Sequence, residues 1–173
     1  IRDGRDVALA YLDRDEWGPQ TIDEAALYWR SRVGRGRRAG EKLGAERYLE
    51  VRYEDLIESF EVTVTAVCEF LGLELAPSML KYYERGEAFA ATTKDPQAFG
   101  RLSLPPTKGL RDWRVQMAPD DVSRFEAIAG QLLADLRYER RNPAPDARAR
   151  ARAVVGWAKW QLKRVVARFG PGK

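Results

Sequence analysis

The first residues of the chain place basic and acidic side chains around a glycine, in the order Arg2-Asp3-Gly4-Arg5-Asp6. The apolar run that follows, 7–12, is typical of a helix that opens just after this turn. A helix N-terminus offers free backbone N–H groups and the positive end of its dipole, and an arginine fork beside it favours anion binding. We therefore expect an anion site here, with Asp6 capping the helix or orienting Arg5. The same residues also fit a plain capped helix start that carries surface arginines.

The composition excludes several classes of chemistry. The 173 residues contain no His and one Cys, so Ser-His and Cys-His catalysis, a disulfide scaffold and zinc sites built on His or Cys are all excluded. Hydrophobic residues make up 45% of the chain, enough for the packed core of one domain or most of one. No apolar run approaches the roughly 18 residues of a membrane span. The chain opens at Ile1 without a signal-peptide pattern, so we expect it to begin inside a longer domain.

Charge is divided unevenly along the sequence. Residues 1–139 carry 20 basic and 25 acidic side chains, whereas residues 140–173 carry 10 basic and one acidic. We therefore expect two parts, an acidic body over 1–139 and a basic tail over 140–173. A basic tail on an acidic body favours a polyanionic partner, although a solvated helix explains the same charges.

The apolar periodicity predicts a mostly helical chain with few strands. Helices are expected over 6–12, 22–33 (which could continue to 43), 54–71, 78–85, 119–136 and 146–169. Thr21 and Glu24 form a candidate capping box for the second helix, and Gly72 is expected to end the third. Ile1 reads as a strand end and 48–53 as a second strand, both as members of a buried parallel sheet whose other strands lie upstream. Residues 87–112 show no period and are expected to form a long functional or mobile loop.

Four segments, in order, resemble sulfotransferases that use 3′-phosphoadenosine 5′-phosphosulfate (PAPS). The segment 2–8 is similar to the Arg-Asp-Pro-Arg-Asp-Val-Ala of that family, and 48–56 to its strand and Tyr-Glu-Asp-Leu helix start, running on to Leu73. Lys108-Gly109, followed by 112–114, resembles its Lys-Gly loop and Asp-Trp-Lys segment. Leu136-Arg137-Tyr138 resembles its closing Gly-Tyr helix end, with Arg137 in place of Gly. Each motif alone is weak, whereas their order over residues 1–139 is specific.

The resemblance implies a cofactor site. Arg2 would bind the 3′-phosphate of PAPS, Tyr53 would lie beside the adenine, and Lys108 with Gly109 would wrap the same phosphate. Three departures bear on this site. Ala10 stands where the family places a second phosphate ligand, a serine, and the lost hydrogen bond is worth about 1 kcal/mol. Thr107 replaces the arginine before Lys-Gly, and the following stretch is one residue short, so Arg111 could supply the missing cation.

The resemblance further implies an α/β fold, the three-layer arrangement related to P-loop NTPases, of which this chain would be a mostly helical C-terminal portion. The phosphate-binding loop and the catalytic base would precede Ile1, so no catalytic residue and no metal ligand is assigned within the chain. The implied reaction moves the sulfuryl group of PAPS to a hydroxyl or amine of a carbohydrate, lipid-linked or small-molecule acceptor and leaves adenosine 3′,5′-bisphosphate. Acceptor contacts would come from loops 14–20 and 86–104, which include Trp17, Tyr82, Tyr83 and Phe89.

Two other functions remain open at this point. A kinase-like phosphoryl transferase of the same fold would bind ATP and Mg²⁺ without preferring a 3′-phosphate. A non-enzymatic module would bind a polyanion or a membrane surface through 146–173, with no specific nucleic acid expected. Helical spacing predicts an apolar stripe on this tail, with Trp157 and Trp160 beside arginines on the other side. The stripe could dock on the body or bind an anionic membrane, so we expect a cytoplasmic protein that could be membrane-peripheral.

Overall fold

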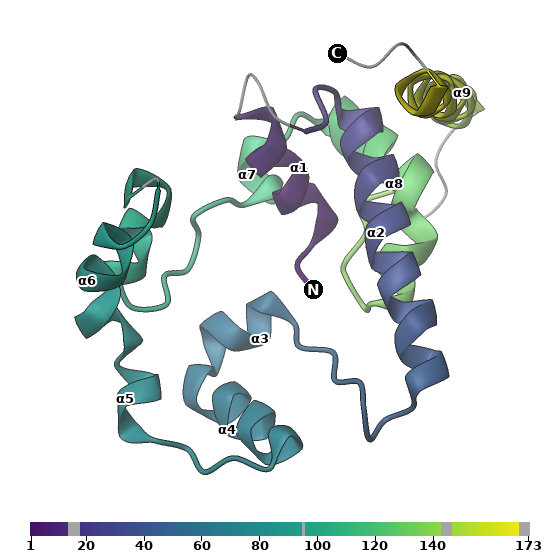
Figure 1. Ribbon diagram of the computed structural model, residues 1–173. Coiled ribbons are helices and arrows are strands. Elements are labelled where there is room, and N and C mark those ends of the chain that lie inside the picture. Colours follow the sequence, from purple (N-terminus) through teal and green to yellow (C-terminus); the bar gives the residue numbers. More distant parts are fainter. Residues whose placement is uncertain (14–17, 95, 143–146, 170–173) are drawn as a thin grey trace. The chain divides into compact units, whose positions relative to one another are not determined.

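A computed structural model describes residues 1–13, 18–94, 96–142 and 147–169; the side chains at 96–98, 100, 149–150 and 163–169 fall outside this description. All regular elements in this part of the chain are helices (Figure 1). They are α1 (Gly4–Leu12), α2 (Ile22–Leu43), α3 (Tyr53–Glu58), α4 (Phe60–Leu71), α5 (Pro77–Leu80), η1 (Tyr82–Arg85), α6 (Gly86–Ala91), η2 (Pro96–Ser103), α7 (Trp113–Gln116), α8 (Pro119–Asp135) and α9 (Ala147–Phe169), where η marks a 3₁₀ helix.

The chain divides into two compact units, and the second runs across the sequence-based boundary at residue 140. The first unit comprises Ile1 and Gly40–Leu110, and the second comprises Arg2–Ala39 and Arg111–Lys173. By sequence, the first unit carries 8 basic and 12 acidic residues, and the second carries 22 and 14. The second unit is therefore the cationic one, and it contains the Arg2 segment, α8 and the basic helix α9 together.

The packed core lies in the second unit, where α1, α2, α7 and α8 meet. Its largest fully buried apolar side chains are Leu27, Trp113, Val122, Phe125 and Leu133. The periodicity of α8 predicts this buried face, and Pro119 with two acidic residues starts the helix as expected. The hydroxyl of Thr21 accepts a hydrogen bond from the backbone N–H of Glu24 at 3.3 Å, which confirms the predicted cap of α2.

Gly4 is the point at which α1 packs most closely on this core. A Cβ atom at this position would overlap the Trp29 ring and lie 2.7 Å from Cζ of Phe125. We expect Gly4→Ala to lower the free energy of unfolding by about 1–3 kcal/mol, because the ring cores cannot move aside without repacking. A Cβ atom on the exposed Gly36 of α2 would meet no atom within 4 Å, so Gly36→Ala should instead stabilise the chain by up to about 1 kcal/mol. Urea denaturation of the Gly4→Ala and Gly36→Ala variants measures both changes in the free energy of unfolding. Equal changes in the two variants would contradict the close packing at Gly4.

The C-terminus of α8 ends in a Schellman turn. The backbone N–H of Arg137 donates to the carbonyl of Ala134 at 2.9 Å, and that of Tyr138 donates to Leu133 at 2.8 Å. The turn requires the left-handed conformation at Arg137, whose φ is 59°. Glycine is the residue that adopts this conformation without strain, and it is the residue that the resembling family places here.

Restoring that glycine should stabilise the chain. We expect Arg137→Gly to raise the free energy of unfolding by about 1 kcal/mol and the melting temperature by about 2–4 °C, since Arg137 is exposed and loses little contact. The change is measured by thermal denaturation. Arg137→Ala removes the same side chain but keeps the strained φ, so it should raise the melting temperature little or not at all. An increase equal to that of Arg137→Gly would show that the removed charge, and not the relieved strain, causes the effect.

The first unit contains the beginning of parallel strand pairing but no strand among its described residues. The terminal amino group of Ile1 donates to the carbonyl of Val51, and the backbone N–H of Tyr53 donates to the carbonyl of Ile1 at 2.6 Å. This alternation is the hydrogen-bond pattern of a parallel pair. The predicted strand 48–53 is nevertheless wrong as a strand in the described chain, because 48–52 forms no regular element and Tyr53 already starts α3. The mostly helical character is confirmed, and the three-layer sheet remains a prediction.

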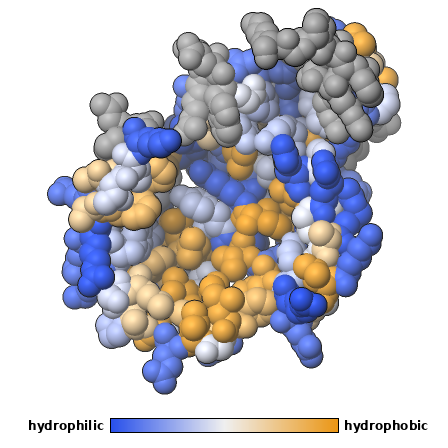
Figure 2. Space-filling model, in the orientation of Figure 1, coloured by the Kyte–Doolittle hydropathy of each residue, from blue (hydrophilic) through white to orange (hydrophobic). Residues whose placement is uncertain are grey.

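Several helix boundaries in this unit also differ from expectation. The predicted helix 54–71 is broken at Ser59 into α3 and α4, while Gly72 ends α4 with φ 67°, as predicted. Gly86 does not end a helix but begins α6, where it packs directly on the backbone of Leu102. The expected loop 87–112 therefore contains α6 and η2. Hydrophobic residues gather on the face that α3 and α4 present (Figure 2), and Val62 and Leu71 of α4 are 71% and 58% exposed.

Candidate functional site

Arg2 lies immediately before α1 and is held by three segments of the second unit. Its guanidinium Nη2 is 3.3 Å from Oδ2 of Asp6 and 3.2 Å from the carbonyl oxygen of Arg111. The indole N–H of Trp29 donates to the carbonyl of Arg2 at 3.1 Å, which fixes the backbone from the α2 side. The side chain remains 20% exposed. Arg2 is thus an oriented cation at a helix start that solvent can still reach, which is the arrangement an anion site requires.

Asp6 partly neutralises this cation. Besides its pairing with Arg2, it accepts the backbone N–H of Trp113 at 2.9 Å. Burial raises the pKa of Asp6 above its ordinary value, and the hydrogen bond from Trp113 and the charge of Arg2 only partly offset this. Because the folded-state pKa is raised, protonation of Asp6 stabilises the fold at low pH, and this contribution is lost as pH rises through the folded pKa.

We expect Asp6→Asn to tighten anion binding at Arg2. Removing one negative charge beside the site should increase the affinity for adenosine 3′,5′-bisphosphate by about fivefold at neutral pH, which corresponds to about 1 kcal/mol. As pH rises, wild type loses the stabilisation that protonated Asp6 provides, whereas the neutral Asn side chain does not titrate. The free energy of unfolding of the variant should therefore increase relative to that of wild type. Calorimetric titration and urea denaturation at two pH values measure both effects. Asp135→Asn, which removes one exposed carboxylate at the end of α8, is the control and should change neither.

Arg5 forms the buried centre of the same unit. It is fully buried, and its guanidinium donates to Asp3 at 2.7 Å and to Glu126 at 2.6 Å while stacking 3.5 Å above the Trp113 ring. A further N–H reaches the carbonyl of Glu139 at 2.6 Å. Arg5 therefore packs inside the protein and is not a surface arginine. Asp3, not Asp6, caps α1, because its carboxylate accepts the backbone N–H of Arg5 at 2.9 Å.

Glu126 extends this cluster to the segment after α8. Only 2% of the residue is exposed, and its carboxylate also accepts the backbone N–H groups of Arg141 at 3.0 Å and Asn142 at 2.6 Å. The cluster of Asp3, Arg5 and Glu126 thus ties the start of α1 to α8 and to residues 139–142. Since Arg2 precedes Asp3 by one residue, the cluster positions the candidate anion site. Trp113 is fully buried against this cluster and serves as a packing anchor.

The structure gives Arg111 a different place from the one expected. Its carbonyl oxygen contacts Arg2, but its guanidinium pairs with Asp13, with Nη2 2.9 Å from Oδ2. The backbone of Arg111, rather than its charge, therefore meets Arg2 in this conformation. Ala10 follows Asp6 by four residues within α1, so the missing hydroxyl would lie on the same face of the helix as Asp6.

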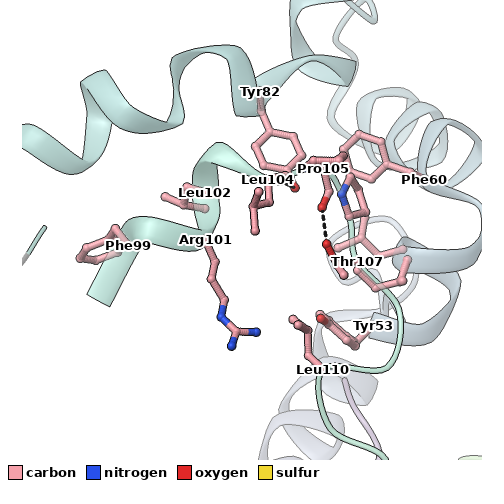
Figure 3. Close-up of a pocket in the computed structure, with 13 residues that line it drawn as sticks. Tyr53, Phe60, Tyr82, Phe99, Arg101, Leu102, Leu104, Pro105, Thr107 and Leu110 are labelled. Carbon is pink, nitrogen blue, oxygen red and sulfur yellow. Dashed lines mark hydrogen bonds between the residues drawn. The ribbon is translucent and has the colours of Figure 1, made fainter. Parts of the chain in front are cut away.

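The first unit contains a cavity of about 350 Å³ in front of Tyr53 (Figure 3). Its walls are aromatic and aliphatic side chains of α3, α4, η1 and η2, closed by the segment 104–110. The lining residues include Tyr53, Leu56, Phe60, Tyr82, Phe99, Leu102, Leu104, Pro105 and Leu110. A mostly apolar cavity of this size fits a planar ring such as a nucleobase. Tyr53 therefore lines a cavity, as its expected place beside adenine requires.

Two polar groups mark the wall of this cavity. Tyr82 donates its hydroxyl to the carbonyl of Leu104 at 3.1 Å, and burial, with smaller effects of Tyr53 and Tyr83, raises its pKa, so the phenol stays neutral at physiological pH. Arg101 extends from η2 toward Tyr53 and Leu110 (Figure 3), and its guanidinium makes no hydrogen bond or ion pair with any described residue. Sequence reasoning missed Arg101 because the segment around it has no helical period.

Lys108 and Gly109 lie in the exposed segment beyond this cavity. The Lys108 side chain is 68% exposed, with Nζ 3.8 Å from Oε1 of Glu58. Gly109 has φ 73°, a conformation that favours glycine, and no described atom lies within 4 Å of a Cβ built on it. Lys108 and Arg2 belong to different units, so a phosphate contact shared by both stays a prediction. Of the expected acceptor residues, Trp17 lies outside the described residues.

Comparison with known proteins adds independent evidence. Residues 1–77 match the model of a family described as the sulfotransferase family. Carbohydrate sulfotransferase 2 of Mus musculus and that of Homo sapiens are each 28% identical over 95 residues, which is 55% of this chain and 18% of each relative. The chain thus spans less than a fifth of the length of these curated relatives. No solved structure matches it.

These matches agree with the resemblance, because residues 1–77 match the sulfotransferase-family model. This region includes Arg2 and Tyr53, two of the expected cofactor residues, whose roles stay predictions. Lys108, Gly109 and Arg111 follow the matched region, and their roles stay predictions.

Proposed function

We propose that this chain provides the nucleotide-binding part of a sulfotransferase that uses PAPS. The observation that carries the proposal is the place of Arg2: within the family-matched segment, it is an oriented, partly exposed guanidinium at the start of α1. A 3′-phosphate dianion suits this position because an oriented guanidinium fork near the positive end of the helix dipole favours it.

The cavity of the first unit, taken by itself, also supports a nucleotide-binding role. Its aromatic lining and the neutral Tyr82 phenol suit adenine, and Arg101, which has no partner among the described residues, adds a positive charge at its wall. Lys108 and Gly109, by the resemblance, would contribute to the phosphate. When bound, PAPS supplies an activated sulfuryl group; the residues described here bind and orient the nucleotide and are not assigned to the chemical step.

The acceptor belongs to the same proposal. The relatives are named carbohydrate sulfotransferases, which favours a sugar hydroxyl as the group that receives the sulfuryl. In the reaction the S–O bond to the nucleotide phosphate breaks as the acceptor oxygen forms its bond to sulfur, and the acceptor proton passes to a general base. The nucleotide leaves as adenosine 3′,5′-bisphosphate.

Titration of the whole chain with nucleotides tests the donor class. We expect adenosine 3′,5′-bisphosphate to bind at least tenfold more tightly than adenosine 5′-phosphate, because only the bisphosphate carries the 3′-phosphate that Arg2 is proposed to bind. ATP with Mg²⁺ should bind no better than adenosine 5′-phosphate. Equal affinities for all three, or a preference for ATP with Mg²⁺, would contradict a PAPS site and favour the kinase-like alternative.

A further inference from the structure

The basic helix α9 packs on the second unit through its small residues. It contacts α8, and a Cβ atom on Gly156 would lie 3.0 Å from Cβ of Asp23 in α2. Arg152 pairs with Asp120 of α8 at 3.1 Å. Ala153 and Gly156 on this side are half-buried. One face of α9 is therefore already occupied by its own unit.

The predicted apolar stripe lies on another face of α9 and is exposed. Val154, Val155 and Leu162 are 66%, 53% and 65% exposed, and Trp157, which lines a hollow with Leu27 and Ile128, is 46% exposed. At 100° per residue, Val154, Ala158 and Leu162 lie within one narrow sector, away from Gly156. Packing of α9 on its own unit therefore leaves more than half of the Val154, Val155 and Leu162 side-chain surface uncovered. The remaining stripe positions, Val165, Val166 and Phe169, have side chains outside the described part.

Cations border this exposed stripe. Arg148 and Lys159 lie on its edge toward Arg152; both are exposed, and neither pairs with an acidic side chain in the described ranges. The segment 140–173 carries 10 basic residues and one acidic residue. An apolar face flanked by lysine and arginine is the pattern of a helix that lies in a membrane interface, with its cations at the level of the headgroups (Figure 2 shows both kinds of residue near α9).

We propose that α9 binds the surface of a bilayer that contains anionic phospholipid, with its apolar stripe inserted and its axis parallel to the surface. A second copy of the chain fits less well, because pairing two such faces brings their cations together. Nucleic acid matches the charge but offers little to an apolar stripe. Within the described ranges, no helix combines the length and apolar character needed to cross a bilayer. This proposal does not depend on nucleotide binding.

Vesicle co-sedimentation of the whole chain tests it. Wild type is expected to sediment with vesicles of phosphatidylcholine and phosphatidylglycerol, and much less with phosphatidylcholine alone. Val154→Glu with Leu162→Glu should weaken binding more than tenfold, because two charges enter the inserted face. The matched control, Val62→Glu with Leu71→Glu, alters the same residue types at comparably exposed positions of α4 and should bind like wild type.

A second pair of variants tests the role of charge. Arg148→Gln with Lys159→Gln should weaken binding by about fivefold per cation, whereas Arg38→Gln with Lys42→Gln, an Arg and Lys pair of α2, should have little effect. Circular dichroism verifies that each variant remains helical. Absence of binding to anionic vesicles, equal loss in the control pairs, or self-association that Val154→Glu with Leu162→Glu abolishes would overturn the proposal.

Discussion

Replacement of Arg5 by alanine is expected to lower the free energy of unfolding by about 3–5 kcal/mol, the largest effect of any substitution considered for this chain. The reason is the burial of its partners. Asp3 and Glu126 are 4% and 2% exposed, and without the guanidinium their charges remain buried with fewer partners. The Trp113 ring also loses the guanidinium stacked on it.

A second variant, Arg5→Lys, keeps the prediction testable even if Arg5→Ala does not fold. Arg5→Lys keeps the charge but cannot reach Asp3, Glu126 and the Glu139 carbonyl at once, so it should recover only part of the loss. Arg35→Ala, on the exposed surface of α2, removes an equal charge and should change stability by less than about 0.5 kcal/mol. Urea denaturation measures all three. An Arg5→Ala variant as stable as Arg35→Ala would contradict the buried cluster.

Arg2→Ala is expected to act on binding rather than on stability. Loss of hydrogen bonds to a charged phosphate should lower the affinity for adenosine 3′,5′-bisphosphate by about 10- to 100-fold. Stability should change little, because the Arg2 side chain is partly exposed and its contacts with Asp6 and the Arg111 carbonyl are long, at 3.3 and 3.2 Å. Calorimetric titration gives the affinity and thermal denaturation the stability. Arg35→Ala is again the control; a comparable loss of affinity in it would indicate a nonspecific effect of charge.

Local signals in the sequence predict the elements that local interactions stabilise. Pro119 and the acids after it start α8, Thr21 caps α2 and Gly72 ends α4, all as expected. The strand prediction for 48–53 fails for the opposite reason. A parallel strand depends on neighbours, and in the described part of this chain only Ile1 supplies backbone partners, through Val51 and Tyr53.

The candidate site shows the same division. The types and order of Arg2, Tyr53 and Lys108 indicate the sulfotransferase family, whose model matches residues 1–77 and so includes Arg2 and Tyr53 but not Lys108. The interior place of Arg5 could not be predicted, because its partner Glu126 lies 121 residues away and charged residues are usually exposed. Arg101 was missed because a 3₁₀ helix in a Pro- and Gly-containing segment gives no apolar period.

A double-mutant cycle tests the central claim, that Arg2 recognises a 3′-phosphate. Wild type and Arg2→Ala are each titrated with adenosine 3′,5′-bisphosphate and with adenosine 5′-phosphate, so that the protein cation and the ligand phosphate are removed separately and together. We predict that Arg2→Ala lowers the affinity for the bisphosphate by at least tenfold and leaves the affinity for the monophosphate almost unchanged. Equal loss for both nucleotides, or no loss for either, would contradict the claim.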